Sequence, residues 1–174
     1  MKRISEDEIR KLYDEYQTPP HVIAHCKAVA ETAEKLGKAL NEHGYKLDLN
    51  LIRSAGLSHD IARTWEDHGG VAADALERLG YVDEAVIVRI HMKYSHFHPV
   101  EKLDECDLVC LADRLVKEDQ YVGLDERINY ILNKAPKKPE IIQTIMERKE
   151  ETRQLLSEIE QVIGKTIDNL LQTQ

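Results

Sequence analysis

Two histidines and two aspartates fall within otherwise apolar stretches of this sequence. They are His25, the adjacent pair His59 and Asp60, and Asp113. A carboxylate buried among apolar residues is costly unless a partner or a metal ion compensates its charge. Each residue alone has a simpler explanation, as a core histidine with satisfied hydrogen bonds or as an aspartate that caps a neighbouring helix. The four together predict a metal site.

The ligand types indicate which ions such a site would take. Two imidazoles and two carboxylates suit a first-row divalent ion, and four protein ligands leave positions open for water and substrate. An ion in an open site lowers the pKa of a water ligand and polarises a phosphoryl oxygen. We therefore expect one or two divalent ions, of Fe, Mn, Mg, Ni or Zn, whose identity the residues do not specify.

The order and context of these residues resemble the HD-domain phosphohydrolases. His25 lies in an apolar stretch after Thr-Pro-Pro, the pair His59-Asp60 lies in Ala-Gly-Leu-x-His-Asp-Ile, and Asp113 ends Leu-Ala-Asp. The resemblance covers about residues 18 to 130. It implies a helical core and hydrolysis of phosphate esters or anhydrides, with nucleotides as substrates of many members. It also implies that Asp60 bridges two metal ions when a second ion is bound.

Two further histidines raise the question of a second metal ion. His68 precedes a stretch rich in glycine and alanine, and His91 ends the next predicted helix. The resulting order H, HD, H, H, D is similar to that of dinuclear hydrolases, which include the symmetrical diadenosine tetraphosphate hydrolases. The alternatives are that His68 is an exposed helix cap and that His91 is a core or loop residue.

Arg63 departs from the family pattern, because many members have a lysine after the His-Asp pair. We expect Arg63 to keep a cation near phosphate and to act in catalysis with His59 and Asp60. Lys93 and Arg114 are predicted to bind the substrate, because a transferring phosphoryl group needs cations at its equatorial oxygens. For each of these cations, a solvated surface charge is the alternative.

The segment after His91 bears on which branch of the family the chain resembles. No second histidine directly follows His91, which disfavours the branch of cyclic dinucleotide phosphodiesterases. His96 and His98 could replace that ligand, or they could lie in a solvated loop.

Helices must position these residues. Apolar residues recur every three or four positions, and aromatic residues make up 5% of the chain. The pattern predicts an all-α, single-domain helical bundle of HD type. Ser5 and Glu8 form a capping-box pattern, and Asp48 or Asn50 could cap the third helix. The expected helices span about residues 6–16, 20–44, 49–65, 70–79, 82–91, 100–117 and 124–133, with a loop at 92–99.

The C-terminal part predicts one long amphipathic helix. Residues 1–138 are the expected HD-domain core, and residues 139–174 form the helix, which Gly164 could kink. The helix either packs on its own core or lies at the interface of a homodimer, because its heptad pattern is too short to decide.

Charge and hydropathy limit the possible partners. A net charge of -8 and an isoelectric point near 5.5 disfavour binding to nucleic acid or to an anionic membrane. No stretch approaches the roughly 20 apolar residues that span a bilayer, and the charged first residues lead into no apolar segment, so we expect a cytoplasmic protein. The expected partner is a small phosphorylated substrate, with a nucleotide as the first candidate.

The cysteines predict no disulfide framework. Cys26, Cys106 and Cys110 are odd in number and lack CxxC spacing, which fits reduced thiols. Cys106 and Cys110 lie one helical turn apart, so they are either small core residues or a metal-binding pair.

The sequence thus favours an enzyme, namely a phosphomonoesterase, a nucleotidase or a dinucleoside polyphosphate hydrolase. The first alternative is a sensory or regulatory module that binds a metal or a nucleotide without turnover. The second is a scaffold that oligomerises through its C-terminal helix and holds a structural metal ion.

Overall fold

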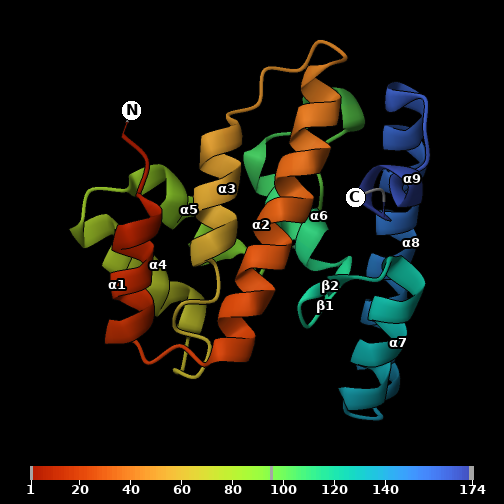
Figure 1. Cartoon of the computed structure of the whole chain (residues 1–174). Coiled ribbons are helices and arrows are strands. Elements are labelled where there is room, and N and C mark those ends of the chain that lie inside the picture. The colour runs from red at the N-terminus through yellow and green to blue at the C-terminus, as the bar shows by residue number, and fades with distance from the viewer. Residues whose placement is uncertain (1, 95, 173–174) are drawn as a thin grey trace.

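The structure is a computed structural model that describes residues 2–94 and 96–172. Within these residues the fold is helical except for one short antiparallel hairpin, which confirms the predicted all-α bundle (Figure 1). The helices are α1 (Glu6–Glu15), α2 (Pro20–Asn41), α3 (Leu49–Ser58), α4 (His68–Arg78), α5 (Val82–Ile90), α6 (Glu105–Asp113), α7 (Leu124–Lys134), α8 (Pro139–Ile163) and α9 (Ile167–Gln172). A 3-10 turn covers Val100–Lys102, and the hairpin strands are β1 (Val116–Lys117) and β2 (Gln120–Tyr121).

The helices α2 and α3 pack side by side at the centre of the molecule, and α6 packs against both. Figure 1 shows α1, α4 and α5 on one side of this pair and α7, α8 and α9 on the other. One buried apolar cluster joins α1, α3, α4 and α5, and a second joins α2, α3, α6, α8 and α9. Because α3 contributes to both clusters, the residues that follow it lie where the two clusters meet.

Local capping signals set several helix ends. Ser5 and Glu8 form the predicted capping box at the start of α1, and the Asp48 side chain accepts a hydrogen bond from Leu51 N at 3.0 Å to start α3. Gly80, which follows α4, has a φ of +87°, a conformation that favours glycine. These signals lie within a few residues of the ends they determine, so the sequence predicts them well.

The third helix is shorter than the sequence predicts. It ends at Ser58, whereas the apolar pattern continues to Ala62. Tyr13 OH donates to the carbonyl of Leu57, and Thr18 Oγ1 donates to the carbonyl of Ile61 at 2.6 Å. Side chains of the N-terminal segment thus replace the next helical hydrogen bonds. The His-Asp pair consequently lies in a series of turns, not in a helix.

The sixth helix is also shorter than the predicted span of 100–117. Asp104 and Asp107 form a capping box that starts it at Glu105. It ends at Asp113, and Glu118, with a φ of +55°, turns the chain between the two strands. Strands of two residues are too short for a period-2 pattern, so the sequence does not predict this hairpin.

The predicted kink at Gly164 is a break between α8 and α9, because Gly164 adopts a left-handed conformation with a φ of +70°. The buried apolar residues of both helices pack on the core of the same chain, in the cluster with α2 and α6. These residues are Leu155, Ile159, Ile163, Ile167 and Leu171. The two helices thus contact their own core, and whether this region also forms a homodimer interface stays a prediction.

The cysteines are free thiols. The sulfurs of Cys106 and Cys110 lie 4.0 Å apart, and the contact with Cys106 together with burial raises the pKa of the Cys110 thiol. No candidate group of metal ligands in the described residues contains a cysteine, which favours the core alternative. No helix of residues 2–94 and 96–172 is both long and apolar enough to cross a membrane.

Candidate metal centre

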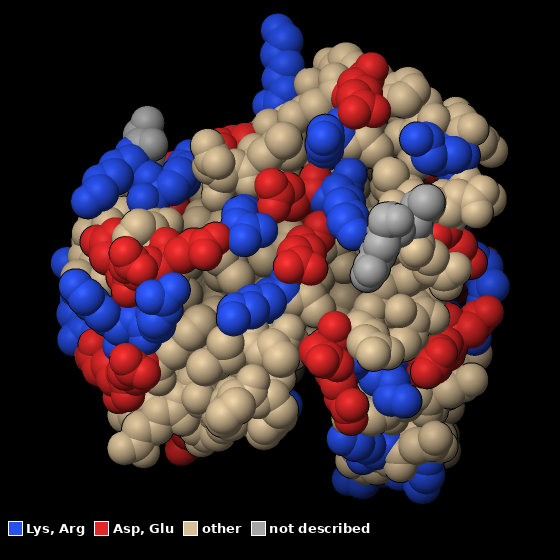
Figure 2. Space-filling view, in the orientation of Figure 1, with Lys and Arg blue, Asp and Glu red and all other residues tan. Residues whose placement is uncertain are grey.

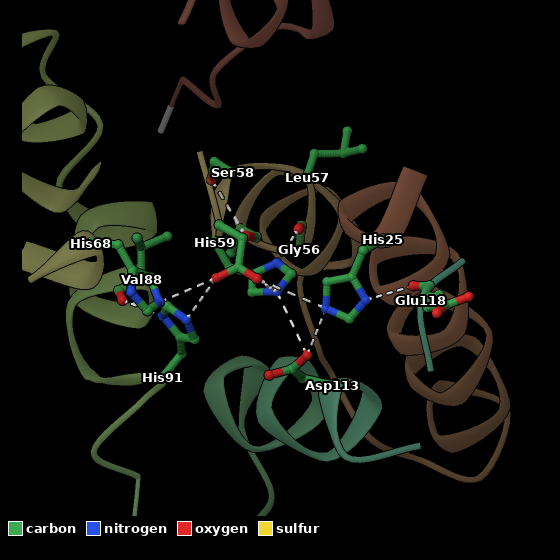
Figure 3. Close-up of polar contacts among 12 residues, drawn as sticks. His25, Gly56, Leu57, Ser58, His59, His68, Val88, His91, Asp113 and Glu118 are labelled. Atoms are coloured by element: carbon green, nitrogen blue, oxygen red, sulfur yellow. Dashed lines mark hydrogen bonds and ion pairs between the residues drawn. The ribbon is translucent and has the colours of Figure 1, made fainter. Parts of the chain in front are cut away.

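The four residues singled out from the sequence come together at the centre of the fold. His25 lies on α2, His59 and Asp60 directly follow α3, and Asp113 ends α6 (Figure 3). His25 Nε2 lies 2.9 Å from Asp113 Oδ1 and 3.9 Å from Asp60 Oδ2. His59 Nε2 lies 3.5 Å from Asp60 Oδ2 and 3.7 Å from Asp113 Oδ1. Three elements thus aim two imidazoles and two carboxylates at one point.

Gly56 permits this approach of α2 and α3. A Cβ atom at Gly56 would lie 2.7 Å from Ala30 Cα, which is closer than such atoms pack. Ala30 lies on α2 five residues after His25, and Gly56 lies three residues before His59. The absence of a side chain at this position therefore lets the two helices carry their histidines into one site.

The two further histidines lie on the other side of Asp60. His68 begins α4 and His91 directly follows α5. His68 Nε2 lies 3.4 Å from Asp60 Oδ1, and His91 Nε2 lies 3.2 Å from the same oxygen. The two Asp60 oxygens thus face different partners, Oδ2 toward His25 and His59 and Oδ1 toward His68 and His91. Figure 3 shows His68 and His91 on one side of His59 and His25 on the other.

Backbone carbonyls orient three of the imidazoles. The Nδ1 atoms of His25, His59 and His91 lie 2.7, 2.6 and 2.6 Å from the carbonyl oxygens of Glu118, Gly56 and Val88. A carbonyl can only accept, so each Nδ1 carries the proton. A neutral ring then has its lone pair on Nε2, which in all three cases faces a carboxylate. Second partners of this kind fix the tautomer of metal-ligating histidines.

A cation between the Nε2 atoms and the carboxylate oxygens would accept their lone pairs, which otherwise face one another. His59 Nε2 and His68 Nε2 are buried and have no hydrogen-bond partner among the described residues. Ligand atoms of His25, His59 and Asp60 lie within 4.8 Å of one another, as do those of Asp60, His68 and His91. Nitrogen and oxygen donors in these sets suit Mn, Fe, Ni or Zn. The residues present therefore fit one divalent ion in each set, with Asp60 shared.

The titration of these groups reflects the same proximity. Burial alone would lower the pKa of His59, but the Asp60 carboxylate beside it raises that pKa well above its ordinary value. Burial alone would raise the pKa of Asp60, but the charge of His59 and the nearby imidazoles of His68 and His91 lower it. The carboxylate of Asp60 is therefore ionised and available as a ligand.

Of the three cations predicted to bind phosphate, Arg63 and Arg114 lie near the centre and Lys93 does not. A cleft with a volume of about 1140 Å³ opens on the centre and is lined by His25, Asp60, His91 and Asp113. Arg63 and Arg114 also line this cleft, whereas the exposed Lys93 does not, although its neighbours Met92 and Tyr94 do. Figure 2 shows the surface hollowed between the N-terminal end of α2 and α7.

His96 and His98 take no part in the centre. His96 Nδ1 lies 3.4 Å from Glu151 Oε2, and His98 Nδ1 lies 2.9 Å from Asp107 Oδ2. The buried Asp107 carboxylate also accepts hydrogen bonds from His98 N and from Tyr94 OH. His98 thus tethers the loop after α5 to Asp107 of α6.

Three cleft cations were not predicted from the sequence. Arg127 and Lys134 lie on α7 and Arg148 lies on α8, and all three line the cleft. Each belongs to a segment rich in charge, so nothing in the local sequence distinguishes them from surface residues. Only their common occupation of one cleft identifies them.

Fold and site together define an all-helical protein with a candidate dinuclear metal centre of histidine and aspartate. Residues 22–117 match the HD domain family, which is more than half of the chain. The chain belongs to this family of metal-dependent phosphohydrolases. The matched region contains His25, the His59-Asp60 pair and Asp113.

Relatives in other organisms match shorter regions. An uncharacterized protein of Methanocaldococcus jannaschii is 38% identical over 71 residues, which is 39% of this chain and 42% of that protein. A tRNA (cytidine(56)-2'-O)-methyltransferase of Thermoplasma volcanium is 37% identical over 81 residues, which is 44% of this chain and 22% of that protein. The chain thus matches less than half the length of each relative. No solved structure matches it.

Proposed function

We propose that this protein hydrolyses a small phosphorylated substrate, with a nucleotide as the first candidate, at a centre of two divalent ions. The observation that carries the proposal is the position of the Asp60 carboxylate, whose two oxygens face two separate pairs of histidines. A shared carboxylate between two sets of ligands is the arrangement expected for a bridging residue. Asp113 would complete the set of His25 and His59.

A pair of bound divalent ions would lower the pKa of a water ligand and stabilise the charge of the phosphoryl oxygens. The protein's own groups supply the rest. The carbonyls of Gly56, Val88 and Glu118 hold the imidazoles in one orientation. Arg63, directly beyond the His-Asp segment and facing the cleft, is placed to neutralise a phosphate oxygen. These groups keep their geometry before substrate arrives, which is what preorganised catalysis requires.

The methyl transfer named for the relative from Thermoplasma volcanium is not part of this proposal. The match covers 22% of that protein, and the residues that form the centre here are those of the HD domain. A nucleic-acid substrate is also disfavoured by the net charge of -8.

The experiment that tests the proposal is phosphate release from a panel of nucleotides, dinucleoside polyphosphates and phosphomonoesters, with Mn²⁺, Fe²⁺ or Mg²⁺ added. We expect turnover of at least one class, and Asp60→Asn should lower the rate more than about 100-fold, because even the outer partners of metal ligands contribute about 10- to 100-fold. The matched control is Asp74→Asn, since Asp74 is exposed on α4 and contacts Arg89.

Two results would contradict the proposal. The first is tight nucleotide binding in calorimetry without release of phosphate from any compound, which would instead support a sensory module. The second is turnover that survives both chelation and Asp60→Asn, which would place the reaction elsewhere.

A further inference from the structure

The cleft at the metal centre has a charge opposite to that of the whole protein. The chain has a net charge of -8, yet five cationic side chains and three carboxylates of the described residues line the cleft. Asp60 and Asp113 are two of these carboxylates and belong to the candidate metal centre. Glu118 is the third, and it lines the cleft outside that centre. The cations are Arg63, Arg114, Arg127, Lys134 and Arg148.

Three of these cations come from three different helices that surround the centre. Arg114 follows Asp113 at the end of α6, Arg127 lies on α7 and Arg148 lies on α8. Arg127 Nε donates a long hydrogen bond of 3.4 Å to the carbonyl of Asp113, which places its guanidinium group directly beside the centre. The three arginines thus line the part of the cleft next to the candidate ligands.

Arg114 is held rigidly in this wall. Its guanidinium group donates to Thr152 Oγ1 at 3.0 Å and to the carbonyl of Tyr94 at 3.1 Å, and it lies 4.6 Å from the ring centre of Phe97. These contacts are neutral, so they fix the position of the group without compensating its charge. An arginine oriented in this way can present its remaining N–H groups to an anion.

None of the three arginines has a carboxylate of the described residues within salt-bridge distance. Burial lowers the pKa of Arg114 and the charge of Arg148 lowers it too, whereas the more distant charges of Glu151 and Asp113 raise it. Arginines outside the cleft do have such partners. Arg53 contacts Glu6 and Glu34, Arg89 contacts Asp74 and Glu77, and Arg153 contacts Asp125. Arg114 and Arg148 repel each other although carboxylates lie farther away, and an anion bound between the arginines would relieve that repulsion.

We propose that Arg114, Arg127 and Arg148 form a second anion-binding subsite, which holds a phosphate group linked to the one hydrolysed at the metal centre. The inference rests on the proposed function and narrows its substrate class to compounds with two or more linked phosphate groups. A phosphomonoester would leave the subsite empty. Guanidinium groups suit the task because their paired N–H donors match two phosphate oxygens.

Two of the three arginines of this subsite lie in the C-terminal third of the chain. Arg127 and Arg148 lie beyond residues 22–117, which match the HD domain family. The helices α7 and α8 therefore have a second role besides covering the core, since they add a basic wall to a centre built by the family region.

The test measures binding without turnover. Metal-loaded protein, in buffer with an excess of the same ion, is titrated in a calorimeter with orthophosphate and with methylenediphosphonate, a non-hydrolysable compound with two linked phosphoryl groups. We expect the diphosphonate to bind more tightly. Arg148→Gln should weaken its binding about 10- to 100-fold, which corresponds to the roughly 1.5–3 kcal/mol of a hydrogen bond to a charged group. Orthophosphate binding should change less than about twofold, since it needs no second subsite.

Arg148 is suited to this test because its side chain is exposed, so the substitution leaves the fold intact. Arg127→Gln should act in the same direction, and Arg148→Lys should restore part of the affinity. The matched control is Arg153→Gln, on the same helix but outside the cleft and paired with Asp125. It should leave both titrations unchanged.

Three results would overturn the inference. The diphosphonate could bind no more tightly than orthophosphate. Arg148→Gln could weaken both ligands equally. A short RNA with a terminal phosphate could bind more tightly than the diphosphonate through the same arginines, which would assign the wall to nucleic acid. Failure of the proposed function is a separate result, because it appears as absent phosphate release and not as altered binding.

Discussion

Asp60 is the residue on which the number of metal ions depends. One oxygen lies 3.5 Å from His59 and 3.9 Å from His25, while the other lies 3.2 Å from His91 and 3.4 Å from His68. Each histidine pair therefore has its own carboxylate oxygen. At this scale the sequence indicated the ligands, but it left open whether His68 and His91 are ligands or a cap and a core residue.

The position of the Asp60 carboxylate between two histidine pairs leads to a prediction about metal content. We expect His91→Asn to remove one of two bound ions per chain, because His68 and one Asp60 oxygen alone make an incomplete set. The ion beside His25, His59 and Asp113 should stay. The measurement is elemental analysis of protein purified without a metal resin, and His43→Asn is the control because the exposed His43 contacts the carbonyl of Ala39 instead. An unchanged content in His91→Asn would contradict the second site.

At the scale of elements, the site depends on how closely helices approach and how loops are tied. Gly56 brings α3 against α2, and Asp107 of α6 holds the loop after α5 through His98 and Tyr94. Neither contact involves one of the six residues of the candidate metal centre. Both nevertheless position ligands, since His59 follows α3 and His91 begins the loop.

Gly56→Ala should destabilise the protein by about 1–3 kcal/mol, the usual cost of inserting a methyl group into a packed core. The added Cβ would meet the α2 backbone at Ala30, which cannot move without moving the helix. Gly37→Ala is the matched control, because its Cβ would meet side-chain ends and no backbone, namely those of Ile52, Leu49 and Leu108. Urea unfolding measures both variants. Equal stability of the two would show that the helices are not in tight contact at Gly56.

The tether of the loop should depend on pH. The hydrogen bond and charge of Asp107 raise the pKa of His98 above the ordinary value of 6.5. A raised folded-state pKa means that the stabilisation is fully present below pH 6.5 and is lost as pH rises through the folded-state value. The protection of residues 96–104 from hydrogen exchange, measured relative to the intrinsic rate at each pH, should therefore fall in that interval above pH 6.5. In His98→Asn the same step should be absent, and a step that persists would assign the effect to another group.

For the whole molecule, the C-terminal helices complete the core and form one wall of the cleft. Ile159 of α8 is fully buried in the cluster with α2 and α6, while Arg148 of the same helix lines the cleft. One helix thus serves stability and the proposed substrate subsite on different turns.

Ile159→Ala should cost about 2–5 kcal/mol in the free energy of unfolding, because it leaves a cavity in a packed interior. Ser157→Ala is the control on the same helix, where the side chain is exposed and the change should stay within about 0.5 kcal/mol. Chemical denaturation followed by circular dichroism measures both. If Ile159→Ala left stability unchanged and altered only an oligomeric state, α8 would be an interface helix.

Features that depend on neighbouring residues could be predicted from the sequence. The capping box at Ser5 and the cap at Asp48 start their helices as expected. The candidate ligands were recognisable because polar groups within apolar stretches need compensation. Both kinds of signal are contained in a few consecutive residues, or in the order of motifs along the chain.

Features that depend on packing were decided by the tertiary structure. The carbonyls of Leu57 and Ile61 bond to Tyr13 and Thr18, so α3 ends before the pattern does. Lys93 lies outside the cleft, whereas Arg127 and Arg148 line it, although all three are similar charged residues in the sequence. The physical reason is that residues close in sequence determine the local conformation. The distances between ligands, and between charged side chains, depend instead on which helix faces pack together.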